Sequence, residues 1–103
     1  MKTIDVIIVR AYLTESERHL NTLLKRLRDW GKLRGVTVFR GIAGYGESGM
    51  HASTLVDMSL HLPLVIEFFE TPDKAEAALD YLQDVIKPGH IISWPAKLNV
   101  KDE

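Results

Sequence analysis

The chain has 103 residues, of which 46% are hydrophobic and 26% charged, and this size and balance are typical of one soluble globular domain. The formal net charge of -1 excludes an overall basic field that would collect nucleic acid or coat an anionic membrane. Because the sequence has no cysteine, it also excludes disulfides, thiolate catalysis and zinc–thiolate sites.

The N-terminal segment predicts a buried strand. Residues 3–12 read TIDVIIVRAY, which is rich in β-branched side chains and bounded by polar ones. The apolar core of this segment covers only residues 6–9, between Asp5 and Arg10. It is too short for a signal peptide or a membrane span, so we expect a cytoplasmic protein.

A helix is predicted next. Thr14 and Glu17 form a capping-box pattern. Apolar residues then recur at helical spacing until Gly31 and Gly35 interrupt the pattern: Leu20, Leu23, Leu24, Leu27 and Trp30. A basic run near the end of this helix is explained as a solvated face that complements the helix dipole: Lys25, Arg26, Arg28, Lys32 and Arg34.

The second half of the chain predicts two more strands around a second helix, after a strand at residues 36–43. Residues 63–70, PLVIEFFE, form the third strand, and Thr71 then caps a helix with Pro72 at its first position. One apolar face of this helix comprises Ala75, Ala78, Leu79, Leu82 and Ile86. The fourth strand covers residues 90–100, where Pro95 indicates an edge strand or a bulge.

The order βαββαβ predicts an α+β, ferredoxin-like fold, with a four-stranded antiparallel sheet and two helices on one face. The other sheet face is expected to be apolar as well, since the first strand alternates Ile4, Val6 and Ile8 with Ile7, Val9 and Ala11, and Ile91 alternates with Ile92 and Trp94 in the fourth. Such a patch is large for a soluble monomer and indicates a homo-oligomer that packs its sheets together. The alternative is a monomer in which only the strand centres are apolar on both faces.

A glycine-rich stretch, GIAGYGESG at residues 41–49, follows the second strand and contains G-x-G-x-x-G. A dinucleotide-binding finger would need these glycines after the first strand of a longer parallel fold, so we reject that interpretation, although Glu70 lies at about the required distance. The connection over residues 44–62 is longer than compact domains normally use, which indicates a functional loop.

The run RGIAGYG, then His51, then LVDMSLHLPLVIEFFE resembles the uncharacterised PII-like family of small proteins, which share the fold of the nitrogen-regulatory PII signalling proteins. The resemblance covers almost the whole chain and is strongest over residues 35–70. It implies a single PII-like domain over residues 1–103 and a homotrimer whose sheets line a central core. It also implies adenine-nucleotide clefts between subunits and a mobile T-loop at residues 44–62 that engages a membrane transporter or an enzyme.

The first candidate ligand residues lie where the second strand runs into that loop. Gly41, Gly44 and Gly46 would let backbone N–H groups approach a phosphate, or would serve a bulged strand end. Arg40 would bind a phosphate through two hydrogen bonds. The alternatives are an intersubunit salt bridge or a strand residue that is exposed to solvent. Tyr45 would stack on a base or lie at a subunit seam.

The turn Lys87-Pro88-Gly89-His90 occupies the position of the PII loop that wraps nucleotide phosphates, and its alternative is a plain helix C-cap. His51 and His61 would bind a ligand phosphate, sense pH or hold a metal. Glu47 and Asp57 would add oxygen ligands to such a metal site, or be solvated loop carboxylates.

The sequence contains no nucleophile elbow and no identifying carboxylate pair, so we expect no catalytic residues and no cofactor. Glu67 and Glu70 stand where an RNA-recognition strand would be basic and aromatic, so we expect no nucleic-acid binding. Two interpretations survive. The first is a PII-like sensor that binds a small anionic ligand, with an adenine nucleotide as a candidate. The second is a CutA-like trimer that binds a divalent metal or has a structural role.

Overall fold

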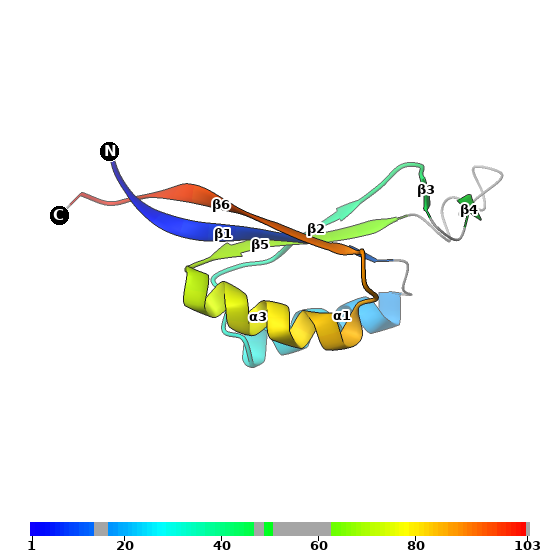
Figure 1. Ribbon diagram of the computed structural model, residues 1–103. Coiled ribbons are helices and arrows are strands. Elements are labelled where there is room, and N and C mark those ends of the chain that lie inside the picture. The colour runs from blue at the N-terminus through cyan, green and yellow to red at the C-terminus, as the bar shows by residue number, and fades with distance from the viewer. Residues whose placement is uncertain (14–16, 47–48, 51–62, 103) are drawn as a thin grey trace.

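The computed structural model describes residues 1–13, 17–46, 49–50 and 63–102. Figure 1 shows one sheet with two helices on one of its faces. The sheet is formed by strands β1 (Lys2–Leu13), β2 (Thr37–Arg40), β5 (Leu64–Glu70) and β6 (Ile91–Val100). The helices are α1 (Glu17–Asp29) and α3 (Pro72–Val85), and two short strands, β3 (Tyr45–Gly46) and β4 (Gly49–Met50), pair with each other.

The strand order is β2-β5-β1-β6, and each of the three pairs is antiparallel. This is the ferredoxin-like arrangement that the sequence predicts. It also confirms that β6, which carries Pro95, is an edge strand. The chain termini lie at one end of the sheet, and β3 and β4 lie at the other (Figure 1).

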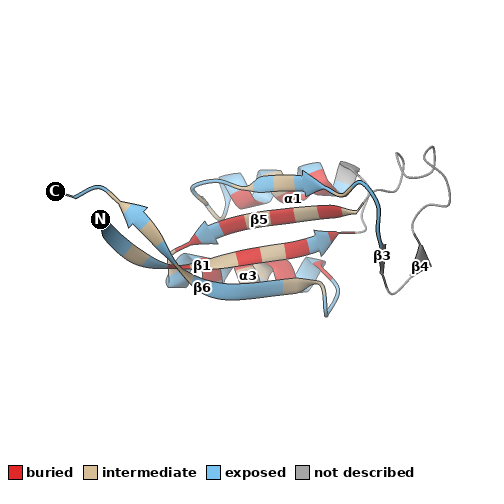
Figure 2. Cartoon of the chain, turned by 90° about the horizontal axis from the view of Figure 1, so that it is seen from above, coloured by how far each residue is buried: buried red, intermediate tan, exposed pale blue. Residues whose placement is uncertain are grey.

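The core lies between the sheet and the helices, where the residues of β1 and β5 are buried in alternation (Figure 2). β1 contributes Val9, Ala11 and Leu13, and β5 contributes Leu64, Ile66 and Phe68. The predicted helix faces supply the other side of the core, in which the buried residues are Leu20, Leu23, Leu27, Ala75, Ala78, Leu82 and Ile86. Hydrophobic burial on one sheet face therefore fixes both helices in place.

Trp30 does not belong to this core, so one part of the predicted apolar stripe is wrong. The helix ends at Asp29, and the side chain of Trp30 is 82% exposed. The chain turns directly after it, since Lys32 has a φ of 51° and a Cβ on Gly31 would lie 3.0 Å from the Leu27 carbonyl oxygen. Because of this turn, Leu33 packs against the core in place of Trp30.

The second helix begins as predicted, with Pro72 at the start of α3. The Thr71 hydroxyl does not cap the helix backbone. Instead it hydrogen-bonds to the Asp73 carboxylate, and this bond is the largest cause that lowers the pKa of Asp73 below its ordinary value. None of the helices in the described part of the chain is long and apolar enough to cross a membrane.

Candidate ligand-binding site

The first group of candidate residues lies where β2 ends. Arg40 pairs with Leu64 of β5 and is exposed. The Gly41 N–H donates to the Pro63 carbonyl oxygen at 2.8 Å, which extends the ladder one residue past the strand. This places Arg40 at the edge of the sheet, on the side that leads to β3.

Gly41 and Gly44 both lie against the ring of Pro63. A Cβ on Gly41 would lie 3.0 Å from Pro63 Cγ, and one on Gly44 would lie 3.1 Å from the same atom. Neither glycine has a positive φ, because Gly89 is the positive-φ glycine of the described residues. The two glycines therefore have a packing reason to be present, and their contact with a phosphate stays a prediction.

Tyr45 and Gly46 form β3, where they pair with Met50 and Gly49. His51 lies outside the described residues, as do His61, Glu47 and Asp57. Most of the predicted loop at residues 44–62 lies outside them too. Within the described residues no three His, Asp or Glu side chains are grouped closely enough to hold a metal ion.

The second group of candidates lies in the turn between α3 and β6. The helix stops at Val85, and the Ile86 N–H donates to the Leu82 carbonyl at 2.8 Å. Gly89 has a φ of 86°, which favours glycine, and His90 Nδ1 lies 3.2 Å from the Pro88 carbonyl oxygen. Lys87 is exposed beside a hollow of about 560 Å³. The helix C-cap is therefore Ile86, one residue before the predicted turn, and Gly89 serves the turn that leads into β6, with Lys87 accessible.

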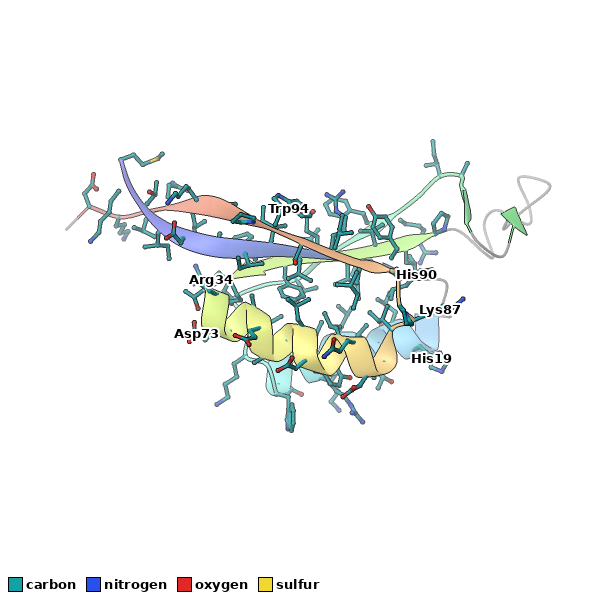
Figure 3. The ribbon with its side chains drawn as sticks, in the orientation of Figure 1. His19, Arg34, Asp73, Lys87, His90 and Trp94 are labelled. Atoms are coloured by element: carbon teal, nitrogen blue, oxygen red, sulfur yellow. The ribbon has the colours of Figure 1, made fainter. Side chains whose placement is uncertain are left out.

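These two groups lie at the same end of the sheet but at opposite edges. At the β2 edge, Arg40 pairs with Leu64, which pairs in turn with Leu13 of β1. At the β6 edge, the His90 carbonyl accepts the N–H of Tyr12, the neighbour of Leu13, at 2.8 Å. Figure 3 shows Lys87 and His90 at the end from which β3 and β4 extend. Three strand spacings separate β2 from β6, which is roughly 14 Å. Within one chain, the backbones of the two groups are therefore separated by the width of the sheet.

The sheet face turned away from the helices, here called the open face, is apolar with one ion pair at its centre. Directly paired residues of the four strands define it: Ile8, Arg10, Tyr12, Phe39, Val65, Glu67, Phe69, Ile92 and Trp94. Phe39 is 48% exposed and Trp94 36%. The predicted second apolar face is present, with more aromatic side chains than the aliphatic pattern of the sequence indicates.

Arg10 and Glu67 were not among the predicted functional residues. Arg10 Nε donates to Glu67 Oε1 at 3.0 Å, and Arg10 Cζ lies 5.7 Å from the centre of the Trp94 ring. The hydrogen bond to Glu67 raises the pKa of Arg10 above its ordinary value. Arg10 is the charged residue within the apolar run VIIVRAY, and Glu67 is the first charged residue within LVIEFFE. Opposite charges within two apolar strands are the sequence signal by which the pair could have been found.

Glu70 is the other unexpected carboxylate. It is fully buried at the end of β5, where its Oε2 accepts the Arg34 backbone N–H at 2.6 Å and its Oε1 lies 3.4 Å from Arg34 Nε. This pair ties the segment after α1 to the sheet. Glu70 is therefore a structural carboxylate. Its distance from the glycine-rich stretch is that of a ribose-binding acid, but its side chain is buried against Arg34.

The fold is that of the PII-like proteins. The structure is similar to that of CPII from Thiomonas intermedia K12 bound to ADP and bicarbonate, with a TM-score of 0.70 and 17% identity, covering 94% of this chain and 91% of that one. It also resembles the divalent ion tolerance protein CutA1 from Ehrlichia chaffeensis, with a TM-score of 0.59 and 10% identity, covering 95% of this chain and 85% of that one.

The chain belongs to the family DUF190, described as "Uncharacterized ACR, COG1993", whose model matches residues 2–98. A UPF0166 protein of Methanocaldococcus jannaschii is 30% identical over 93 residues, which are 82% of each chain. The family resemblance noted from the central stretch of the sequence is thereby confirmed.

Proposed function

We propose that this protein is a PII-like regulatory protein, a homotrimer that binds a small anionic ligand in the clefts between its subunits. An adenine nucleotide is the candidate ligand. Residues 1–103 form one domain that acts in the cytoplasm without catalysing a reaction. Ligand binding changes the state of residues 44–62, which dock on a membrane transporter or an enzyme. Such a switch requires that the ligand binds the two loop states with different affinity.

The observation that carries this proposal is the division of the candidate residues between two sheet edges. Arg40 and Gly41 lie at the β2 edge, and Lys87 to His90 lie at the β6 edge, roughly 14 Å away across three strand spacings. A closed ring of subunits brings one edge of each chain against the opposite edge of the next. The two groups then meet once at each interface.

The open face supports the same assembly. Aromatic and aliphatic side chains from four strands surround the Arg10–Glu67 pair there, and contiguous apolar patches of this kind mark interfaces. Packing the open faces together removes this surface from water. The Arg10–Glu67 pair keeps the two charges matched when they are desolvated.

The chemistry of the two edges favours a phosphate-bearing ligand. Arg40 supplies a planar, permanently charged donor, and Lys87 supplies an ammonium group beside a turn whose backbone is held by Gly89. The similar CPII structure is described as bound to ADP, which makes ADP the first nucleotide to test.

The test combines a light-scattering mass with an ADP titration of wild-type protein and single variants. We expect a trimer, with ADP affinity reduced about tenfold or more in Arg40→Gln and in Lys87→Gln, since each removes a charge-assisted hydrogen bond worth about 1.5–3 kcal/mol. Arg28→Gln is the matched control, because Arg28 is exposed on α1 and pairs with Asp29. A monomer, or equal affinity in all three variants, would contradict the proposal.

A CutA-like role is the second candidate, favoured by the similar CutA1 structure. In that case the protein binds a divalent metal through His51 and His61, or serves a structural role, and nucleotides are irrelevant. A melting temperature that rises with divalent metal in the wild type, but not in His51→Ala or His61→Ala, and does not respond to ADP, would favour this function.

A further inference from the structure

A groove of about 400 Å³ lies between α1 and α3, on the helix layer of the molecule. Its apolar wall comprises Leu13, Leu20, Leu23, Tyr81, Val85 and Ile86. Most of these side chains are buried or half-buried, but Val85 is 48% exposed. A volume of this size is within the range of small-molecule sites, whose walls are mostly apolar with a few polar groups.

Among the described lining residues, the polar side chains of α1 form one row. They are His19, Thr22 and Arg26, at a spacing of three and four positions, and Tyr81 of α3 adds a phenol hydroxyl. Figure 3 shows His19 near Lys87, at the end of the molecule where α1 begins and α3 ends. The rim therefore carries the permanently charged guanidinium of Arg26 and the polar side chains of His19 and Thr22 along one row of α1.

The opposite side of the groove adds no charge. α3 has four exposed carboxylates, Asp73, Glu76, Asp80 and Asp84, but its contribution to the lining is Tyr81, Val85 and Ile86. An anion seated against Arg26 thus meets apolar side chains across the groove, with no carboxylate among the described lining residues.

We propose that this groove binds a small amphipathic anion, a carboxylate on an apolar aliphatic or aromatic body. The carboxylate contacts Arg26 and Thr22 on the α1 rim. The apolar body lies against Leu20, Leu23 and Val85, where it removes exposed apolar surface from water. Its lining differs from the candidate residues of the subunit cleft, because neither Arg40 nor Lys87 is part of it, although Ile86 also lines the hollow beside Lys87.

Octanoate is the probe, titrated into protein with labelled Leu and Val methyl groups and followed by nuclear magnetic resonance. We expect saturable shifts confined to the Leu and Val residues of the groove, which are Leu13, Leu20, Leu23 and Val85, with unchanged signals from Val65 on the open face. Octan-1-ol, which lacks the charge, should bind about tenfold more weakly. Saturating ADP should not displace octanoate.

Two pairs of variants separate the groove from general effects of charge. Arg26→Gln should weaken octanoate about tenfold, whereas Arg28→Gln, elsewhere on α1, should leave it unchanged. Val85→Asp places a carboxylate in the groove and should abolish binding. Ala77→Asp, at an exposed position of α3 outside the lining, should not.

Three results would each overturn the proposal. One is octanoate shifts on the open face with none in the groove. Another is equal affinity for octanoate and octan-1-ol, which would show that Arg26 does not select an anion. The third is groove signals that move with protein concentration and not with octanoate, which would show that a second copy of the chain covers this surface.

Discussion

Asp73 illustrates how one side chain makes stability depend on pH. Its carboxylate accepts a hydrogen bond from the Thr71 hydroxyl and lies in the first turn of α3, and these contacts lower its pKa from the ordinary value of 3.8. A lowered folded-state pKa means that the ionised group stabilises the fold above the unfolded-state pKa. This contribution is lost as the pH falls through the folded-state value.

Asp73→Asn should therefore lower the melting temperature at pH 6, where the wild-type carboxylate is charged. The difference between the two proteins should begin to close as the pH falls below the unfolded-state pKa of about 4, and it should vanish only below the lowered folded-state pKa, where both side chains are neutral. Thermal melts from pH 6 to pH 2 measure this difference, with Asp84→Asn as a control at an exposed position of the same helix. A constant difference across the range would contradict the role of the Asp73 charge.

The elements follow from the sequence wherever periodicity decides burial. Alternation in β1 and β5 and the leucine spacing of α1 predict the core, since each pattern has one solution that buries its apolar side chains. Trp30 shows the limit of this reasoning, because its spacing continues the helical stripe while the turn at Gly31 and Lys32 redirects the chain.

The candidate site was less accessible to sequence reasoning than the core. Arg40, Lys87 and His90 were predicted as ligand residues, but their placement at opposite edges depends on which strands pair, and this is a property of the whole sheet. The Arg10–Glu67 pair likewise depends on the register between β1 and β5. Periodicity fixes which face a residue occupies, but it does not fix its neighbour across the strand.

At the end of β2, packing and ligand binding make different demands on the same glycine. The Gly41 Cα faces Pro63, so Gly41→Ala should lower the free energy of unfolding by about 1–2 kcal/mol through overpacking. Pro63→Ala removes the obstructing ring atom, so the double variant should be more stable than the sum of the single changes predicts. Urea unfolding of the four proteins gives this coupling energy, and additive changes would show that the contact with Pro63 is unimportant.

The open face is formed by all four strands together, and in the proposed trimer its apolar residues are covered by those of the other subunits. Trp94→Asp puts a second carboxylate beside the Arg10–Glu67 pair and should convert the proposed trimer to a monomer. Asn99→Asp is the matched control, since Asn99 is exposed on the same strand and its side chain points to the opposite face. A light-scattering mass distinguishes the two, and a trimeric Trp94→Asp protein would exclude the open face as the interface.

Each ligand site is proposed to be shared between two subunits, and a subunit-mixing experiment tests this sharing directly. Arg40→Gln and Lys87→Gln chains are refolded separately and as an equal mixture, and the stoichiometry of ADP binding is measured for each. In a mixed trimer one interface of three combines an intact Arg40 edge with an intact Lys87 edge. With random assembly, about a quarter of all sites should therefore regain wild-type affinity. No regained sites in a mixture that forms mixed trimers would show that Arg40 and Lys87 do not share a ligand across the interface.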